Sequence, residues 1–489
     1  MALYAGFDCS TQRLSVVVID AGRRTVVYRD SLPFAEPFVV ADDPAVVHAS
    51  PEMWAAALET MLGRVARNID RTALRAISGS AQQHGSVYCG DRPDTLTRET
   101  SPIWMDSSTA RECDEIEAAL GGASALAQFT GSRAFPRFTG PQIRKFWRDE
   151  PDAYARTARI HLVSSFLASV LTGTHAPIDH ADASGMNLMD IRTREWSVAA
   201  MAATAPGLRE KLPPLVPSST VIGTLDGRWQ DRFALPPVRI VAWSGDNPCS
   251  MIGTGLVHEG QLAVSLGTSD TIFGPMREPR VSHDGTGHVF ASVLGAYMGI
   301  TVFRNGSLAR ERVRDAFGWT WDDLSKALRQ TPAGNGGALM LPWFEPEITP
   351  PVSQPSVVRV GLDRATPAQQ ARAIIEAQMM ALSAHSAWMG VTLEAIFATG
   401  GAAANRDILQ VLADVFAADV HRFDASDSAA LGAALRAWQA HSGLDWPTVV
   451  GGFATPPSSG RVRPITEHVR TYQDLQRRYI ALEAAALAR

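Results

Sequence analysis

Short apolar runs that end in polar turns form the first clear pattern along the chain. Residues 3–7 make such a run, which leads into the polar turn 8–12 and then into the β-branched run 15–19, so the pattern predicts two strands joined by a turn. The same design returns over residues 261–273, with small hydroxyl-bearing residues in the turn at 267–270. Two such units predict a duplicated α/β protein with two domains.

Apolar residues at helical spacing occupy much of the remaining chain. Residues 54–65, 366–390 and 469–482 repeat apolar positions every three or four residues, which predicts three amphipathic helices. Strands that alternate with helices of this length are typical of α/β folds.

Prolines mark a division near the middle of the chain. They cluster at 213–217 and at 236–237, and such clusters are typical of loops between structured segments. We therefore expect an N-terminal domain at residues 1–237 and a C-terminal domain at residues 238–489.

Composition places the chain among ordinary globular proteins. Of its 489 residues, 46% are hydrophobic and 19% charged, and this length suits two or three domains with a sizeable core. The 45 basic and 50 acidic residues give a net charge of −5, which argues against nucleic-acid or anionic-membrane partners because these need a basic excess. We expect a soluble protein, since no apolar run reaches the roughly 18 residues of a membrane span.

The cysteines and the first residues bear on cellular location. Cys9, Cys89, Cys113 and Cys249 are scattered without the spacing of a zinc site or a disulfide framework, which is typical of a reducing cytosol. The amino terminus lacks the basic and apolar regions of a signal peptide. These features predict a cytoplasmic protein.

Both predicted turns carry groups that suit phosphate chemistry. In the turn Asp8-Cys9-Ser10-Thr11, hydroxyls and backbone amides can face phosphate oxygens, and a carboxylate at a strand end can hold hydrated Mg²⁺. The turn Gly267-Thr268-Ser269 adds hydroxyls and a glycine that permits close backbone approach. Ordinary hairpin turns are the alternative at both places, because Asp, Ser, Thr and Gly are common in them.

A glycine pair marks a third candidate site. The apolar run 395–399 stops at Gly400 and Gly401, and a helix with one apolar side follows from Asn405. A strand, a glycine pair and a helix amino terminus suit a nucleotide because no side chain blocks its approach, while close helix–strand packing is the alternative. The chain contains no Gly-Lys-Ser/Thr sequence, which disfavours a P-loop enzyme.

Two further segments offer acid–base and hydroxyl-binding groups. Asp246 and Asn247 follow a strand-like run, where a carboxylate can accept a proton from a substrate hydroxyl. A helix N-cap before the next proline is the alternative for this pair. Gln83 and His84 follow another strand-like run and provide donors and acceptors for a polyol, although a lone histidine is more often structural.

Several single residues are ambiguous by themselves. Trp104 is expected in the core, and Arg137 is expected to be a surface charge or an ion-pair partner. His258, His283 and His288 lack the spacing of metal ligands, so we expect no metal-binding cluster there.

These features recur in one order along nearly the whole chain. The segments are 7–12, 80–86, 101–109, 130–134, 182–188, 245–248, 263–270, 398–402 and 405–416. Together they resemble the FGGY family of carbohydrate kinases, within the actin–hexokinase–Hsp70 superfamily, and within that family most closely the eukaryotic-type xylulose kinases. The resemblance implies an α/β fold class with two ribonuclease-H-like domains and an active-site cleft between them.

The resemblance also implies an activity and the residues that perform it. It implies an ATP-dependent kinase that phosphorylates D-xylulose at the terminal O5 hydroxyl, with Asp246 as catalytic base and Asp8 holding Mg²⁺ through water. The sugar-contacting residues would be Gln83, His84, Arg137, Asp246 and Asn247. Ser10, Thr11 and Thr268 would face the phosphates, and Gly400, Gly401, Asn405 and Trp321 would hold the adenosine, with Trp319 competing with Trp321 for that place.

Two departures from the family pattern bear on the substrate. Ser10 stands where the family's first phosphate turn usually has glycine, although the eukaryotic-type branch also carries serine. Gln83 stands where many bacterial xylulose kinases have methionine. Kinases for another ketopentose or polyol, such as ribulose or an alditol, are therefore the first alternative, and a non-catalytic sugar or nucleotide sensor is the second. The implied partners are a small sugar and ATP, and a homodimer is the commonest default for the oligomeric state.

Overall fold

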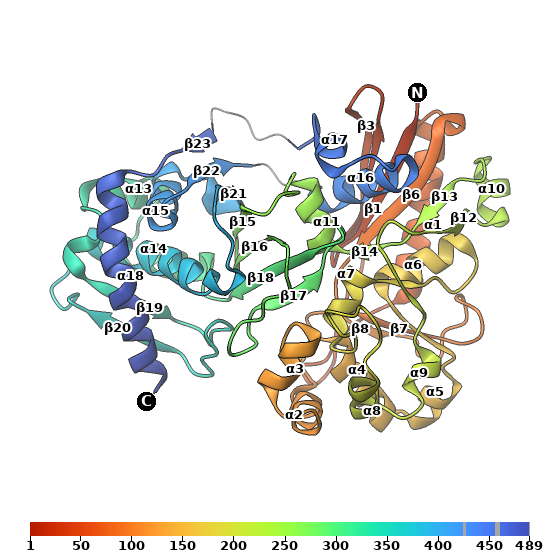
Figure 1. Cartoon of the computed structure of the whole chain (residues 1–489), viewed down its shortest axis with the longest axis horizontal. Helices are drawn as coiled ribbons and strands as arrows, with labels where there is room; N and C mark the ends of the chain where they lie inside the picture. Colours follow the sequence, from red (N-terminus) through yellow and green to blue (C-terminus); the bar gives the residue numbers. More distant parts are fainter. Residues whose placement is uncertain (424–426, 455–459, 489) are drawn as a thin grey trace.

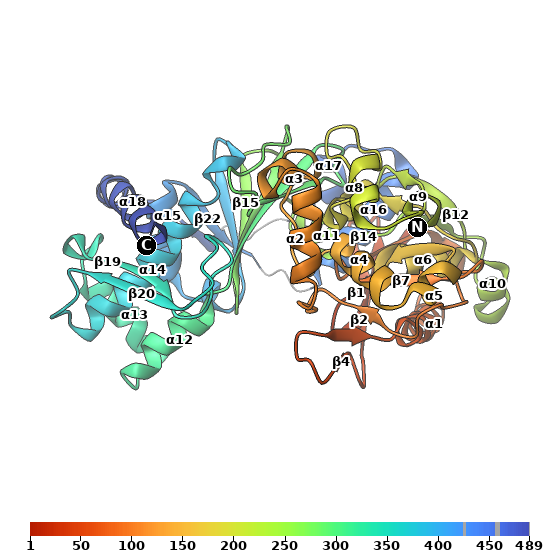
Figure 2. The ribbon, with the colours of Figure 1, turned by 90° about the horizontal axis from the view of Figure 1, so that it is seen from below.

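The computed structural model describes residues 1–423, 427–454 and 460–488. Its strands form two seven-stranded mixed sheets, each packed against helices, and the two halves lie side by side along the long axis of the molecule (Figures 1 and 2). One large apolar cluster packs between the first sheet and its helices, and a second joins the core around the second sheet to residues 88–212 of the first half. Several of the predicted site residues line a cavity between the two halves.

The first sheet is built on an antiparallel meander of the earliest strands. β1 (Leu3–Cys9), β2 (Arg13–Asp20) and β3 (Thr25–Pro33) form this meander, and β6 (Leu74–Ala81) lies parallel to β1. β13 (Arg239–Val241) continues the sheet parallel to β6, β12 (Val221–Thr224) is antiparallel at the edge, and β14 (Ser244–Gly245) also pairs with β6.

The second sheet repeats the order β12-β13-β6-β1-β2-β3 of the first and adds β17 at one edge. β15 (Gln261–Leu266), β16 (Asp270–Met276) and β18 (Tyr297–Phe303) form its meander, followed by β21 (Ala395–Thr399) parallel to β15 and β22 (Asp419–Arg422) parallel to β21. β17 (His288–Ala291) and β23 (Arg461–Val462) pair antiparallel at the two edges. The predicted duplication and the two-domain α/β fold class are therefore confirmed.

The first sheet continues beyond residue 237, where the sequence predicts a division. β13 and β14 both pair with β6 and so belong to the first half. α16 (Ser428–Ser442), from near the end of the chain, packs on β1 and β6 of that same sheet (Figure 1). The proline-rich loops thus connect elements of one half, because pairing with β6 holds the following strands in the same sheet.

The three helices that the apolar spacing predicts are all present. α1 (Pro51–Asn68) begins after Ser50, whose side chain accepts a hydrogen bond from the Met53 amide. α14 (Pro367–Ala384) begins at a reciprocal capping box between Thr366 and Gln369, and α18 (Thr466–Leu487) closes the chain. Among the described residues, no helix combines the length and apolar character that crossing a membrane requires.

Shorter elements surround these helices and sheets. The remaining helices are α2 (Ala110–Ala119), α3 (Ala123–Thr130), α4 (Thr139–Asp149), α5 (Pro151–Arg156), α6 (Val163–Thr172), α7 (His180–Ala183), α8 (Val198–Thr204), α9 (Leu208–Lys211), α10 (Gly227–Phe233), α11 (Asp246–Gly253), α12 (Ser307–Ala316), α13 (Trp321–Gln330), α15 (Arg406–Phe416) and α17 (Trp446–Val450). The small sheets pair β4 (Val39–Val40), β5 (Val47–Ala49) and β8 (Ser101–Pro102), then β7 (Ser86–Cys89) with β9 (Arg159–Leu162), β10 (Ile178–Asp179) with β11 (Leu215–Val216), and β19 (Leu339–Trp343) with β20 (Ser356–Val360).

Glycines let α11 and α16 pack closely against each other and against β1. A Cβ atom at Gly432 of α16 would lie 1.9 Å from the Cys249 carbonyl oxygen, and one at Gly253 of α11 would lie 1.9 Å from the Ser428 carbonyl oxygen. A Cβ at Gly6 of β1 would lie 2.1 Å from the backbone of α16. These close approaches fix α11 on the first sheet, and the first residue of α11 is the predicted catalytic base.

Gly432→Ala is expected to destabilise the protein despite the higher helix propensity of alanine. The methyl group would meet backbone rather than a flexible side chain, so α11 and α16 must separate, at a cost of about 2 kcal/mol or more. Denaturant unfolding measures this loss. The control is Gly227→Ala at the start of α10, where an added Cβ meets no heavy atom within 4 Å. Equal stability of the two variants would show that the helices do not need this close approach.

Candidate active site

Two cavities meet at the amino terminus of α11. The larger one, about 830 Å³, is lined by residues of both halves, including Gln83, His84 and Asp246 from the first and residues of β16 and β17 from the second. The smaller one, about 570 Å³, lies beside α11, α16 and the end of β21. Asn247 and Thr271 line both cavities, so a ligand in one can contact a ligand in the other across the start of α11.

Asp246 is the first residue of α11, directly after β14. Gly245 is the N-cap residue of this helix, so the alternative in which Asp246 and Asn247 cap the helix is wrong. The Asn247 backbone amide and side-chain Nδ2 donate to Asp246 Oδ1 at 2.7 and 3.1 Å. Burial raises the pKa of Asp246 to about 7, and the charge of Asp8 adds to this shift.

Asp8 lies near the end of β1, opposite Ser80 of the parallel strand β6. The Ser80 hydroxyl donates to Asp8 Oδ1 at 2.6 Å. Burial raises the pKa of Asp8 to about 6, which this hydrogen bond partly offsets. Among the described residues neither Asp8 nor Asp246 forms an ion pair, and Arg13, the cation that acts on Asp8, pairs with Asp427 instead.

The two predicted phosphate turns differ in how they are held. In the first, the Ser10 hydroxyl donates to the Arg13 carbonyl at 3.0 Å, and Thr11 Oγ1 accepts from Trp104 Nε1 at 2.8 Å. In the second, Thr268 is exposed at the tip of the β15–β16 turn. Asp270, which follows this turn, receives two hydrogen bonds of 2.7 and 2.9 Å from the fully buried guanidinium of Arg310.

The predicted sugar-binding residues are brought together around the larger cavity. Gln83 Oε1 accepts from Asn247 Nδ2 at 2.9 Å, which links β6 to α11. His84 Nδ1 lies 2.9 Å from the Gly185 carbonyl oxygen, so Nδ1 carries the proton and Nε2 is left as an acceptor. Burial, with the charge of Arg137, lowers the pKa of His84 to about 3, and the ring is neutral.

Two sequence-based expectations about the cavity wall are wrong. Trp104 is expected in the core but is 46% exposed and lines the larger cavity, because its ring nitrogen reaches out to Thr11. Arg137 is expected as a surface charge or ion-pair partner, yet it lines the same cavity and pairs with no carboxylate of the described residues. Its guanidinium lies over the rings of Phe135 and Phe138, at 4.7 and 5.5 Å from their centroids.

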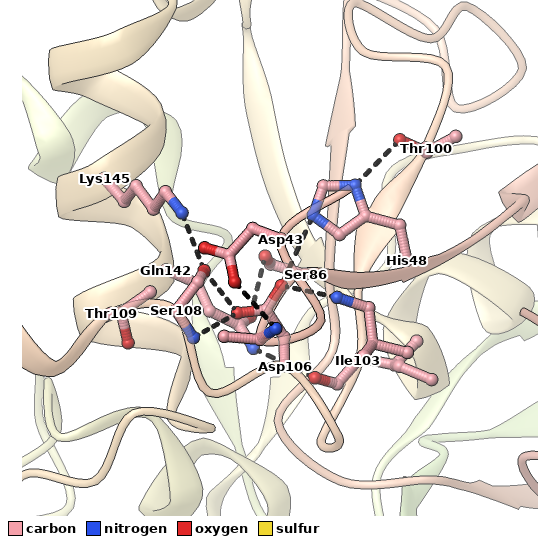
Figure 3. Close-up of polar contacts among 12 residues, drawn as sticks. Asp43, His48, Ser86, Thr100, Ile103, Asp106, Ser108, Thr109, Gln142 and Lys145 are labelled. Carbon is pink, nitrogen blue, oxygen red and sulfur yellow. Dashed lines mark hydrogen bonds and ion pairs between the residues drawn. The ribbon is translucent and has the colours of Figure 1, made fainter. Parts of the chain in front are cut away.

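A polar network behind this wall holds the loop that carries Trp104 (Figure 3). Asp106 accepts from the Val47 amide at 3.0 Å and from the Ser108 hydroxyl at 2.7 Å. Gln142 of α4 accepts from Ser86 at 3.1 Å, and its Nε2 donates to the Arg137 carbonyl at 3.0 Å. The network therefore ties the Trp104 loop and the Arg137 loop to neighbouring elements.

The predicted adenosine residues lie around the end of β21 and the start of α15. Gly400 lines the smaller cavity with φ of 88°, and a Cβ there would lie 2.6 Å from the Leu266 carbonyl oxygen, so glycine is required. Gly401 has open space around it. Asn405 Oδ1 caps α15, and its Nδ2 donates to Ser325 of α13 at 2.7 Å.

The two competing tryptophans have different surroundings. Trp321, the first residue of α13, is 39% exposed, and the Arg314 guanidinium lies 4.5 Å from its ring centroid. Trp319 is half-buried and packs on Phe317, with ring centroids 5.3 Å apart. Neither tryptophan lines either cavity, so the choice between them stays a prediction.

Sequence reasoning missed the residues that the second half contributes to the larger cavity. Thr271, His288, Phe290 and Arg304 line it from the second sheet. It also missed three hydroxyl-bearing residues of the smaller cavity, Ser250, Thr254 and Ser428. None of these residues follows a motif with a recognisable spacing, because strand pairing and helix docking bring them together from distant parts of the chain.

Comparison with known proteins assigns both halves to one family. The family model described as "FGGY family of carbohydrate kinases, N-terminal domain" matches residues 3–253. The model of the C-terminal domain of the same family matches residues 262–441.

Curated relatives and a solved structure match over nearly the whole chain. The xylulose kinase of Mus musculus is 39% identical, covering 99% of this chain and 94% of the relative. Xylulose kinase 2 of Arabidopsis thaliana is 40% identical, covering 89% and 87%. The crystal structure of a xyloylose kinase from Brucella ovis superposes with a TM-score of 0.87 at 26% identity, covering 99% of both chains.

Asp246→Asn is expected to stabilise the folded protein at about pH 8 and to lose this advantage as the pH falls. The pKa of Asp246 is raised from 3.8 to about 7 on folding. Its neutral form therefore favours the native state fully below about pH 4, and this contribution is lost as the pH rises through about 7. The amide is neutral at every pH and avoids that loss.

Thermal unfolding of both proteins between about pH 4 and pH 8 measures this difference. Asp152→Asn, on the exposed side of α5, is the matched control and should follow the wild type at every pH. A melting-temperature difference for Asp246→Asn that is the same at pH 5 and pH 8 would contradict the raised pKa.

Proposed function

The chain belongs to the FGGY family of carbohydrate kinases, and from this premise we propose that it is a xylulokinase. Such an enzyme uses ATP to phosphorylate D-xylulose at O5 and yields D-xylulose 5-phosphate and ADP. The observation that carries this proposal is that Asp246 lines the larger cavity directly beside Asn247, which lines both cavities. A sugar in the larger cavity and a nucleotide in the smaller one would bring the O5 hydroxyl and the γ-phosphate together beside it.

Asp246 is proposed to be the general base. Both of its hydrogen bonds from Asn247 go to Oδ1, which leaves Oδ2 to take the O5 proton as that oxygen attacks the γ-phosphorus. A base works best with a pKa near the operating pH, and burial brings the pKa of Asp246 to about 7. Phosphoryl transfer needs little else from the protein than in-line positioning and neutralisation of charge.

Four side chains are proposed to hold the sugar. Arg137 provides donors, Asn247 Oδ1 and His84 Nε2 provide acceptors, and Gln83 is fixed by its hydrogen bond with Asn247 Nδ2. A polyol offers several hydroxyl groups that both donate and accept, so this mixture of groups suits it better than an apolar ligand.

ATP is proposed to lie in the smaller cavity, with Ser10, Thr11 and Thr268 facing its phosphates and Gly400, Gly401, Asn405 and Trp321 around its adenosine. The donor set at Asp8 fits Mg²⁺, because this ion is usually held by one or two carboxylates, water and the phosphates of the substrate. Within the described residues no cluster of three or more His, Cys, Asp or Glu side chains could hold a metal. When bound, Mg²⁺ would neutralise phosphate charge, and Asp8 would orient it through water.

A cytoplasmic location and a homodimer are proposed on more general grounds. All four cysteines are free and buried, as expected in a reducing compartment. Two-fold dimers are the commonest oligomers of soluble enzymes.

D-xylulose is expected to be the best acceptor in a coupled ADP-release assay with ATP and Mg²⁺. The test panel contains D-xylulose, D-ribulose and an alditol, with a sugar-free reaction as control. Because water competes with O5 as nucleophile, closure of the cleft around the sugar should keep ATP hydrolysis slow in its absence. A higher kcat/KM for D-ribulose or the alditol would make that compound the proposed substrate of this FGGY kinase. If no phosphoryl transfer to any of the three were found, a non-catalytic sensor would be favoured.

Asp246→Asn is expected to lower kcat for D-xylulose by at least about 100-fold, the usual scale for loss of a general base. Because the amide keeps the size of the side chain, the variant should still bind the sugar, which calorimetry can measure. Asp152→Asn controls for the change of charge. Unaltered turnover in Asp246→Asn would show that another group takes the proton.

A further inference from the structure

The larger cavity holds an arginine that forms no ion pair with a carboxylate of the described residues. Arg137 lies on the loop before α4, and its guanidinium stacks over Phe135 and Phe138. Burial lowers the pKa of Arg137 to about 10, yet the side chain remains charged near neutral pH. A stacked, unpaired guanidinium can still rotate about its own axis, so a further contact is needed to fix the direction of its N–H groups.

His288 of the second half provides this contact. Arg137 Nη2 donates to His288 Nε2 at 2.9 Å, across the boundary between the two halves. Since a guanidinium only donates, His288 Nε2 must accept, and the ring proton lies on Nδ1. Burial and the neighbouring charge of Arg137 lower the pKa of His288 well below its usual value, so the ring stays neutral.

The backbone around His288 is itself anchored on the first half. The Val289 amide donates to the Gly131 carbonyl at 2.9 Å, and the Arg133 amide donates to the Gly285 carbonyl at 3.0 Å. The His288 ring also meets Phe135 edge-on, with ring centroids 4.8 Å apart. β17 therefore belongs to the second sheet by pairing with β18 but is docked against the loop that carries Arg137.

A purely structural histidine would be expected to satisfy both ring nitrogens. His288 is 2% exposed, and its Nδ1 has no hydrogen-bond partner among the described residues. A buried donor without an acceptor costs stability. Nε2 of His288 thus accepts a hydrogen bond from Arg137, while Nδ1 has no acceptor among the described residues. This arrangement favours a role in the cavity over a role in the core.

We propose that His288 is a positioning residue for the sugar site, which accepts one N–H of Arg137 and thereby aims the remaining N–H groups at an oxygen of the bound ketose. The inference rests on the proposed function, in which Arg137 contacts the sugar. It assigns to the second half a part in sugar recognition as well as in nucleotide binding.

The test compares His288→Leu, which fills the space but cannot accept, with His288→Gln, which keeps an acceptor oxygen. Steady-state kinetics with D-xylulose should show a KM about tenfold higher or more for His288→Leu, with a much smaller change in kcat, as expected for loss of a hydrogen bond to a charged group. His288→Gln should recover most of this loss. His161→Gln, at a buried histidine beside His175 and away from both cavities, is the matched control and should leave KM unchanged.

A double variant shows whether His288 acts through Arg137. If it does, adding His288→Leu to Arg137→Met should raise KM no further than Arg137→Met alone. An additive increase, a KM for His288→Leu equal to that of the wild type, or no recovery in His288→Gln would each overturn the proposal. Thermal unfolding and the Kd of ADP show whether each variant is folded. If His288→Leu is misfolded, the KM values of His288→Gln and Arg137→Met are used instead to decide. A wild-type protein that does not phosphorylate D-xylulose would instead refute the proposed function.

Discussion

The parallel pairing of β6 with strands on both of its sides determines where the proposed site residues lie. β1 pairs along one side with Asp8 opposite Ser80, and β14 pairs along the other with Gly245 opposite Ala81, directly before Asp246. β6 itself continues into Gln83 and His84. Because parallel strands end at one edge of a sheet, the proposed metal-side carboxylate, the proposed base and the proposed sugar-binding segment emerge together. A shift of one residue in the β14 register would turn Asp246 away from this edge.

This register gathers two half-buried carboxylates at one edge of the first sheet. Burial raises the pKa of both Asp8 and Asp246, and no ion pair among the described residues balances either charge. At the corresponding turn of the second half, two nitrogens of Arg310 neutralise the buried carboxylate of Asp270. That closed pair holds the β15–β16 turn in one shape. The first half therefore leaves the charges of Asp8 and Asp246 unbalanced, as the proposed roles with a cation and a proton require, whereas the charge pair at the second turn supports its shape.

Local pattern predicts the strands, the turns and the long helices, because apolar spacing and turn residues act within a few positions of each other. The site residues came from short motifs that end strands, such as Gln83-His84 and Asp246-Asn247. Local pattern does not show which strands pair. The prolines near residue 237 therefore predict a domain boundary there, although β13 and β14 continue the first sheet beyond it. It also does not show which side chains meet across a gap in sequence. Local pattern alone therefore gives the wrong surroundings for Trp104 and Arg137, and only the resemblance puts Arg137 among the sugar-contacting residues. His288, 151 positions from Arg137, has no local signal at all.

Because the two sheets share a strand order, corresponding positions of the two halves can be compared directly. In both sheets the first strand pairs antiparallel with the second and parallel with a later strand, so β15 and β21 correspond to β1 and β6. Asp8, the second-last residue of β1, stands opposite Ser80, and Ser265, the second-last residue of β15, stands opposite Thr399. Ser265 and Thr399 both line the smaller cavity. Neutral hydroxyls thus occupy the place where the first sheet has a carboxylate, and a second carboxylate there would repel the anionic nucleotide that the cavity is proposed to hold.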